Sequence, residues 1–469
     1  MKEEHINTQS GIKKENKMGT QPIGKLLFTM SLPAILSMLV NALYNIVDSI
    51  FVAHISEDAL SALSLVFPLQ FLIIAVAIGT GVGLNSLISR RLGARMQEAA
   101  DRAASHGIIL AVLGGLVFAL IGIFGSKPYI LAFSEVPSIS EYGIQYCSVI
   151  LTFSIFAFIS ATIEKIFQAT GNMIYPMFIG LSGGLINIVL DPILIFGLFG
   201  LPRLEVLGAA LATIISQFIG LCVAVGLWMK QEHAVKISLK GFRFHGQTVK
   251  EIYAVGFPAI LMQAIGSVML VGLNAILISF SSTAVAVLGA YFRLQSFVFM
   301  PVFGLNQGVM PLVGYNFGAK NKSRVIKTFK LGLLACLGIM FFGFLLFQLL
   351  PGPLLMLFDA SDQMMEIGLN ALRLISICFI PAAFGISCST LFQATGHGVL
   401  SLIISLARQL FFILPLAYLL AQQFGVNRVW LAFPLSEIAS VLICLLFLVY
   451  IYKKEIKHLG NGEKKLPAM

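Results

Sequence analysis

The chain has 469 residues, of which 58% are hydrophobic and only 11% are charged, and its formal net charge is +10. Soluble domains contain about half apolar and about a quarter charged residues. A soluble core cannot bury so much apolar side chain. The composition therefore excludes a soluble protein and indicates an integral membrane protein.

Long apolar runs follow one another along the chain. A helix needs about 20 apolar residues to cross the hydrocarbon, and backbone in lipid must form its hydrogen bonds internally. Twelve such runs predict an all-α fold with twelve transmembrane helices. Glycines at 79–83 and 180–184 predict close helix packing or local flexibility in two of them, and not breaks. The predicted spans are residues 26–54, 61–89, 104–125, 140–168, 173–199, 206–230, 251–280, 284–315, 328–350, 365–395, 398–422 and 428–452.

Basic residues cluster in only some of the segments outside the spans. Cytoplasmic segments carry the excess of Lys and Arg in membrane proteins, and the clusters fall on one side if the spans alternate in direction. Both termini are therefore predicted to be cytoplasmic. The positive net charge is explained by these cytoplasmic segments, and no nucleic-acid partner is expected. The clusters lie at residues 13–25, 90–102, 230–250, 320–330 and 453–465.

The polar segments predict the domain limits. Residues 1–24 lack the apolar core of a signal peptide and are predicted to be a disordered cytoplasmic tail. All six cysteines fall inside apolar spans, so neither disulfide bonds nor a metal site are expected. The remaining parts are an N-terminal lobe at 25–230, a cytoplasmic linker at 231–250, a C-terminal lobe at 251–453 and a second cytoplasmic tail at 454–469.

An internal repeat organises the chain. The letters FQATG of Phe167–Gly171 recur 225 positions later, at Phe392–Gly396. The same offset relates Pro33 in SLPAIL to Pro258 in GFPAIL, and it relates LGAR at 92–95 to FGAK. A constant offset over several stretches indicates a tandem duplication of two six-helix halves.

Six spans are an even number, so the two halves have the same orientation and form parallel repeats around a central cavity. Pro33 and Pro258 occupy matching places and indicate either bending helices at that cavity or kinks that membrane helices tolerate. Gly171 and Gly396 suit left-handed C-terminal helix caps with a structural role.

The segment Gly19–Lys25 reads GTQPIGK and resembles a phosphate-binding loop. It lacks the Ser or Thr that holds magnesium, and no strand precedes it. No nucleotide partner is expected, so transport driven directly by ATP is not expected either.

Acidic residues inside the spans are candidates for function, because burying a charge in a membrane is costly. Asn41 and Asp48 lie on one face of the first span, and Asn187 and Asp191 on one face of the fifth. Both Asp residues are predicted to lie in the outer half of the membrane, and Pro192 frees one backbone carbonyl beside them. These oxygens predict a site for Na⁺ or for a proton. The alternative is that they only join helices.

The second half does not repeat these acids. By the offset, Asp48 corresponds to Leu273 and Asp191 to Leu416, so the predicted cation site is one-sided. Glu164, beside Lys165 near the inner end of the fourth span, is interpreted as structural or gating.

Aromatic and methionine side chains predict the nature of the cargo. Met adapts to irregular partners, so a cavity lined by Phe and Met suits apolar substrates of variable shape. Tyr44, Phe297 and Met300 are predicted to line the cavity, because their spans are expected to face it.

The two halves carry five characteristic stretches, SLPAIL, YNIVDSIFV, RRLGA, FQATGN and NIVLDPILIFG. With these stretches the chain resembles the multidrug and toxic compound extrusion (MATE) family over about residues 20–455. The resemblance implies a drug/cation antiporter of the bacterial inner membrane. It places a cation site on Asn41, Asp48, Asn187 and Asp191, with Thr213 less securely placed. It matches the branch with acids in the N-terminal lobe, and sodium and proton both remain open as the coupling ion.

The sequence thus predicts a secondary active multidrug exporter that exchanges amphipathic cations for H⁺ or Na⁺. Besides its substrates its partner is membrane lipid, and it is expected to be a monomer without a cofactor. A lipid-linked saccharide flippase is the alternative, but it would need several basic residues in its cavity, and only Arg293 and Arg408 lie mid-span. Glu437 could form an ion pair inside the C-terminal lobe with one of the arginines in its spans, which are Arg293, Arg373 and Arg408. The Asp-rich motifs of a membrane prenyl transferase are absent, so the chain is not expected to be an enzyme.

Overall fold

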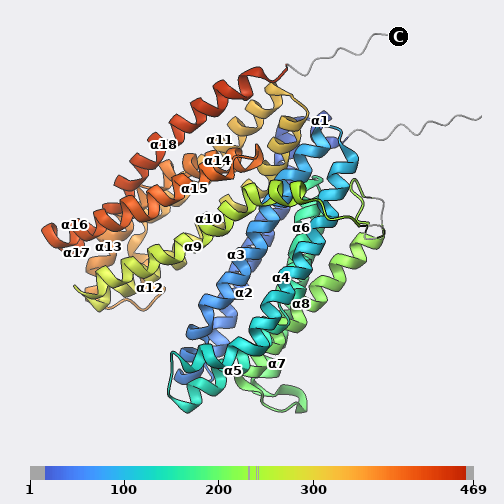
Figure 1. Cartoon of the computed structure of the whole chain (residues 1–469). Coiled ribbons are helices and arrows are strands. Elements are labelled where there is room, and N and C mark those ends of the chain that lie inside the picture. Colours follow the sequence, from blue (N-terminus) through green and yellow to red (C-terminus); the bar gives the residue numbers. More distant parts are fainter. Residues whose placement is uncertain (1–15, 231–232, 239, 241, 461–469) are drawn as a thin grey trace, which may run out of the picture.

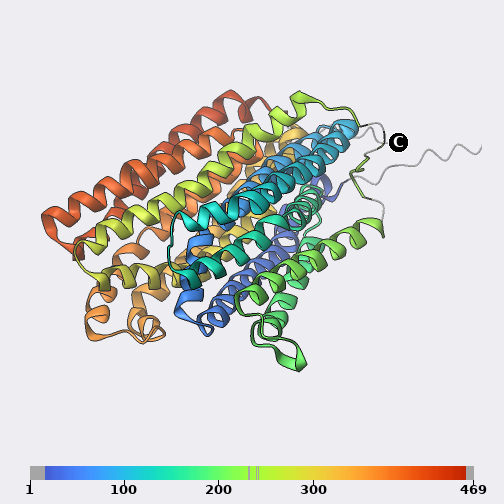
Figure 2. The ribbon, with the colours of Figure 1, turned by 60° about the horizontal axis from the view of Figure 1, so that its bottom comes forward.

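The computed structural model describes residues 16–460 apart from 231–232, 239 and 241, and for 44–46, 48–50 and 53 it describes the backbone alone. Two helical bundles lie side by side, an N-terminal lobe coloured blue to green and a C-terminal lobe coloured yellow to red (Figures 1 and 2). In the described part of the chain, ten helices are long and apolar enough to cross a membrane, and two bent helix pairs raise the number to twelve. The predicted all-α fold of twelve spans is confirmed.

The spans alternate in direction within each lobe, and some of them consist of two or three consecutive helices. Those of the N-terminal lobe are α1 (Lys17–Thr20), α2 (Ile23–Ala53), α3 (Glu57–Gly93), α4 (Gln97–Leu131), α5 (Pro137–Thr152), α6 (Ile155–Ala169), α7 (Ile174–Phe196) and α8 (Glu205–Met229). Those of the C-terminal lobe are α9 (Gly246–Ile278), α10 (Ser282–Gly318), α11 (Lys322–Leu349), α12 (Pro351–Met356), α13 (Asp362–Ser376), α14 (Phe379–Ala394), α15 (Gly398–Leu406), a π-helix (Ala407–Ile413), α16 (Leu414–Phe424), α17 (Val426–Val429) and α18 (Ala432–Lys454).

The duplication is visible in the backbone conformation as well as in the amino-acid sequence. Gly171 and Gly396 both have positive φ, +87° and +97°, and each ends a helix in the same way. Arg95 and Lys320, 225 residues apart, also share positive φ values of 59° and 55°. The predicted left-handed caps at Gly171 and Gly396 are therefore confirmed.

The fourth and tenth predicted spans are not continuous helices. Helix α5 meets α6 at 43°, and α13 meets α14 at 47°. Neither proline nor glycine marks the first break; instead, glycines of α4 fit against both of its sides. A Cβ on Gly115 would lie 2.6 Å from Ile155 Cα, and one on Gly122 would lie 2.7 Å from Thr152 N. Tertiary packing fixes this bend, so the local sequence does not reveal it.

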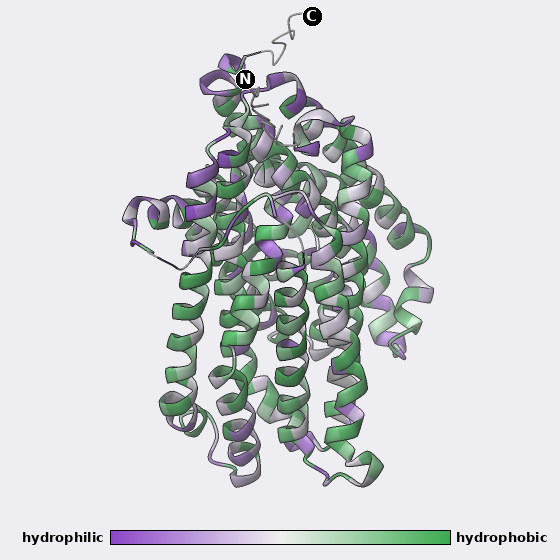
Figure 3. Cartoon of the chain, turned by 90° about the vertical axis from the view of Figure 1, so that its right-hand side faces the viewer, coloured by the Kyte–Doolittle hydropathy of each residue, from purple (hydrophilic) through white to green (hydrophobic). Residues whose placement is uncertain are grey.

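Both ends of the described chain lie on one face, which we call the terminal face. The backbone N–H of Lys322 donates to the Gly460 carbonyl at 3.2 Å, and Asn316 Nδ2 donates to the Met18 carbonyl at 3.1 Å. Hydrophilic residues gather toward this end, while the helix middles are hydrophobic (Figure 3). The described residues of the predicted basic clusters lie toward this face.

The predicted disordered tail, residues 1–24, differs from the structure at its end. Residues 1–15 lie outside the described chain, but α1 follows them, and α2 already begins at Ile23. Met18 has no exposed surface. Burial of this apolar side chain stabilises an ordered segment, although the polar composition around it predicts disorder.

The lobes touch near the terminal face and diverge away from it (Figure 1). Helix α3 packs on α9 and α10, and α2 packs on α10. A Cβ on Gly83 would lie 2.1 Å from the Ile252 carbonyl oxygen, and one on Gly93 would lie 1.8 Å from that of Tyr315. Only glycine allows this approach of the two backbones. The close packing predicted for the glycines at 79–83 is thus found between the lobes.

Candidate cation site and contacts between the lobes

Asn187 and Asp191 form a buried polar pair on α7. Their exposed fractions are 3% and 0%, and Asn187 Nδ2 donates to Asp191 Oδ1 at 3.3 Å. The Asn187 Oδ1 atom is buried without a hydrogen-bond partner among the described residues. A buried acceptor that is not satisfied is costly, so this oxygen is available to a bound cation or water. Pro192 follows Asp191 within the helix.

Helix α8 packs antiparallel to α7 and brings further polar groups to this level. A Cβ on Gly208 would lie 2.5 Å from the Leu194 carbonyl, and one on Gly183 would lie 3.8 Å from that of Ser216. Between these two contacts, the half-buried Thr213 lies level with Asn187.

Gln217, one turn beyond Thr213 on α8, was not predicted. Its Oε1 atom is buried without a hydrogen-bond partner among the described residues. Its spacing of four residues from Thr213 places both on one helix face, and this spacing is the signal that could have revealed it.

Helix α2 borders α7 on the other side, and both run from the terminal face to the opposite face. A Cβ on Gly180 would lie 2.7 Å from Ser37 Oγ, which fixes the register of the two helices. Asp191 lies eleven residues beyond Gly180 and Asp48 eleven beyond Ser37. At 1.5 Å per residue, the backbones at 48 and 191 lie at the same level.

The remaining α2 candidates are only partly described. Asn41 is half-buried. The side chains of Asp48 and Tyr44 lie outside the described residues, so their proposed roles stay predictions.

Glu164 lies beside a polar chain that crosses between the lobes. The Glu164 side chain is half-buried on α6 next to Lys165. Lys165 Nζ donates to Gln168 Oε1 at 2.9 Å, and Gln168 Nε2 donates to Gln307 Oε1 of α10 at 3.0 Å. The two glutamines were not predicted, because one glutamine in an apolar span carries no pattern.

The predicted prolines lie where α2 and α9 contact the other lobe. Pro33 lies two residues from Ile35, whose Cα would be 2.6 Å from a Cβ on Gly304. Pro258 lies two residues from Ile260, whose backbone N would be 2.7 Å from a Cβ on Gly79. Both helices thus carry a proline beside the lobe interface, and whether these prolines bend during transport stays a prediction.

The two cavity candidates on α10 differ in exposure. Phe297 is 47% exposed and Met300 is half-buried. Their contact with substrate remains a prediction.

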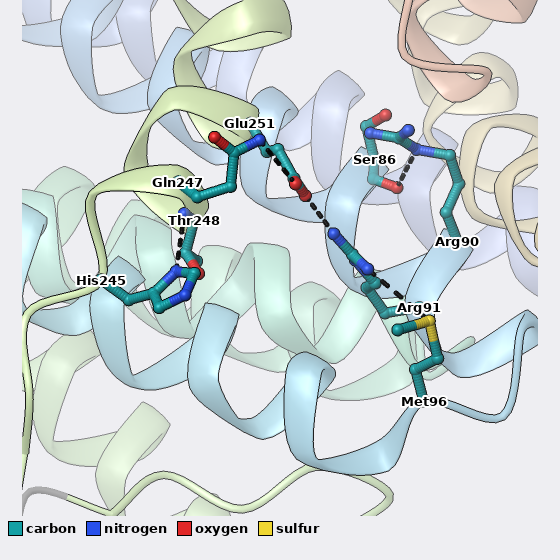
Figure 4. Close-up of polar contacts among 8 residues, drawn as sticks. All are labelled: Ser86, Arg90, Arg91, Met96, His245, Gln247, Thr248 and Glu251. Atoms are coloured by element: carbon teal, nitrogen blue, oxygen red, sulfur yellow. Dashed lines mark hydrogen bonds and ion pairs between the residues drawn. The ribbon is translucent and has the colours of Figure 1, made fainter.

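An ion pair joins the lobes at the terminal face (Figure 4). Arg91 of α3 pairs with Glu251 of α9. Glu251 also accepts a hydrogen bond from Gln247 Nε2 at 3.2 Å. Beside them, Arg90 Nε donates to the Ser86 carbonyl at 3.1 Å. The Glu251 carboxylate is therefore held in a contact between lobes.

The C-terminal lobe contains the expected Arg–Glu pair. Arg408 Nη1 lies 2.8 Å from Glu437 Oε1, with the side chains 28% and 5% exposed. Arg408 belongs to the π-helix and Glu437 to α18. The carboxylate compensates the charge of the arginine inside the lobe.

Known proteins resemble the chain over nearly its whole length. The MatE family profile matches residues 33–193 and again 258–419. The multidrug export protein MepA of Staphylococcus haemolyticus is 28% identical over 434 residues, covering 91% of this chain and 93% of that protein. The FAD transporter of Shewanella oneidensis is 27% identical over 427 residues, covering 90% and 94%.

Solved structures agree with this assignment. One is described as the outward-facing conformation of a multidrug resistance MATE family transporter of the MOP superfamily. It is 27% identical, has a TM-score of 0.88 and is matched over 95% of this chain and 99% of that chain. The two profile matches begin 225 residues apart, as the repeat does. The chain belongs to the MatE family and is a membrane transporter, not an enzyme.

Proposed function

We propose that this transporter is a secondary active multidrug exporter, which exchanges amphipathic cations for H⁺ or Na⁺ as its lobes rock about the central cavity. The observation that carries the proposal is the buried Asn187–Asp191 pair with its unsatisfied amide oxygen. A carboxylate with adjacent amide and hydroxyl oxygens suits a monovalent cation, and a buried carboxylate can instead take up a proton.

The level of Asp48 supports a shared site. Its backbone lies level with that of Asp191 on the neighbouring helix, so a single cation could lie between the two carboxylates. Two carboxylates that share one cation would oppose each other's ionisation, which favours exchange of a bound cation over a permanently empty site. Asn41 and Thr213 would complete the site from α2 and α8.

We place the terminal face in the cytoplasm of a bacterial cell, because the clusters of Lys and Arg lie there. In this orientation the lobes are closed toward the cytoplasm and diverge outward, so the structure corresponds to an outward-facing state. The similarity to a transporter described as outward-facing supports this assignment. Release of cargo to the outside is the step that this state would perform.

The saccharide flippase is not favoured. Of its two candidate mid-span arginines, Arg408 is already paired with Glu437. Arg293 alone would hold a pyrophosphate poorly, since such groups are bound by several basic side chains. The relative MepA, described as a multidrug export protein, supports drug export instead.

Efflux of a cationic dye from proteoliposomes tests the proposal. A proton gradient and a sodium gradient are imposed separately, in the absence of ATP. We expect one of them to drive efflux and Asp191→Asn to abolish it. Dye export driven by ATP alone, or by neither gradient, would contradict the proposal.

A further inference from the structure

The short helix α1 and the residues around it, 16–22, occupy a place between the two lobes at the terminal face. We call this segment the N-terminal strap. Asn16 caps α1, and its Oδ1 accepts a hydrogen bond from the Met18 N–H at 3.0 Å. The strap continues directly into α2, the first span of the N-terminal lobe.

The strap is bound to the C-terminal lobe through its backbone. Arg324 Nη2 donates to the Met18 carbonyl at 2.9 Å and to the Gln21 carbonyl at 2.7 Å. Asn316 Nδ2 donates to the same Met18 carbonyl at 3.1 Å. Arg324 Nε in turn donates to Asn316 Oδ1 at 2.9 Å, which orients the guanidinium toward the strap.

The Met18 side chain connects the strap to the N-terminal lobe. Met18 is fully buried, and a Cβ on Gly171 would lie 3.0 Å from its Cγ and 3.1 Å from its Sδ. Gly171 ends α6 in the repeated FQATG turn. On the other side, a Cβ on Gly19 would lie 3.0 Å from Tyr315 Cε1 of α10. One short segment therefore contacts both lobes.

Comparison of the two FQATG turns shows what the strap does. The turn at Gly396 is contacted directly across the lobe boundary, since a Cβ there would lie 2.6 Å from Arg90 Nη1. By the repeat offset, the residue that corresponds to Arg90 is Tyr315. Tyr315 contacts Gly19 of the strap, and the neighbouring Met18 contacts Gly171. The Gly396 turn is thus contacted by Arg90 of the other lobe. The Gly171 turn is contacted by the strap, which lies between it and Tyr315.

We propose that the N-terminal strap is a latch that holds the lobes together at the terminal face and so stabilises the outward-facing state. Separation of the lobes there would break either the two carbonyl hydrogen bonds to Arg324 or the contact of Met18 with Gly171. The strap would then set the balance between the two states of the transport cycle. This inference rests on the alternating access of the proposed function.

Spin labels on the two lobes test the latch directly. Cysteines replace the exposed residues Lys230 and Lys327, and Cys222, the exposed native cysteine among those described, becomes serine. Electron–electron distances are then measured in lipid nanodiscs without substrate or gradient. We expect Arg324→Gln to raise the ratio of separated to closed lobes about tenfold, because it loses hydrogen bonds from a charged group. Met18→Ser should raise the ratio by a similar factor, because it loses the burial of an apolar side chain.

Two further variants make the result decisive. Deletion of residues 1–19 leaves every span intact and should give at least the same shift. Thr20→Ala changes an exposed strap residue and should leave the distances as in the wild type. Unchanged distances in the three latch variants, or an equal shift with Thr20→Ala, would overturn the proposal. If the transporter were not driven by an ion gradient, only the dye-efflux assay on the wild type would show it. The spin-label distances test the latch alone, so the latch and the proposed function can be rejected independently.

Discussion

The two lobes share a fold, an orientation and even the φ angles of their turns. They differ in their buried charged side chains. The N-terminal lobe places Asp191 on α7 beside Asn187. The C-terminal lobe has Leu416 at the corresponding position and instead pairs Arg408 with Glu437. After duplication, one copy can keep a carboxylate for exchange while the other neutralises its charges. A fold repeated twice need not repeat a site.

The largest expected effect comes from neutralising the acids of the N-terminal lobe. Asp191→Asn and Asp48→Asn mimic the permanently protonated form, so they should remove the cation exchange while leaving the fold intact. We expect normal membrane expression and efflux reduced to the rate measured without a gradient. Dye efflux and fluorescence size-exclusion chromatography measure the two properties. Full gradient-driven efflux in both variants would show that these acids are structural.

The opposite outcome is expected in the C-terminal lobe. Glu437→Gln leaves the Arg408 charge without its carboxylate, and removing one partner of a buried ion pair costs about 3 kcal/mol of stability. The thermal midpoint should fall, while efflux per folded molecule should decrease much less than in the Asp191 variant. The double variant Arg408→Met, Glu437→Leu should recover most of the stability. A stable Glu437→Gln variant without efflux would place coupling in this lobe as well.

The sequence predicted the features that depend on composition and repetition. The twelve spans, the duplication and the caps at Gly171 and Gly396 followed from apolar length and from recurring letters. The break between α5 and α6 could not be predicted, because it is set by the glycines of α4. The polar chain of Gln168 and Gln307 joins residues far apart in sequence, and only the packing of the lobes brings them together.

A third prediction concerns the surface that the lobes share. Gly93→Ala would place a Cβ 1.8 Å from the Tyr315 carbonyl oxygen, so the lobes could not approach as closely at the terminal face. Overpacking of this kind costs about 1–3 kcal/mol, and efflux should fall about tenfold. Gly338→Ala is the matched control, since its Cβ would meet nothing within 4 Å. Equal efflux in the two variants would mean that close contact at Gly93 is not required.

The smallest expected effect comes from the sixth letter of the repeated turn, which is Asn172 in one lobe and His397 in the other. Asn172 Oδ1 accepts a hydrogen bond at 3.1 Å from the N–H of Ile174, the first residue of α7. His397 Nε2 instead lies 3.0 Å from Glu455 Oε1. Burial lowers the pKa of His397, and the nearby Glu455 carboxylate opposes this shift only in part. The neutral imidazole is therefore the form that the fold favours.

The sign of the pH dependence follows from this lowered pKa. The contribution of His397 to stability is present above the ordinary pKa of about 6.5 and is lost as the pH falls through the folded value. The side chain is 27% exposed, so the loss should be less than about 1 kcal/mol. His397→Asn, which copies the other lobe, should flatten the fall of the thermal midpoint between about pH 7 and pH 5 relative to the wild type. If both proteins lose stability equally over this range, the titrating group is a different one, and the difference between the two turns has no role in the acid response.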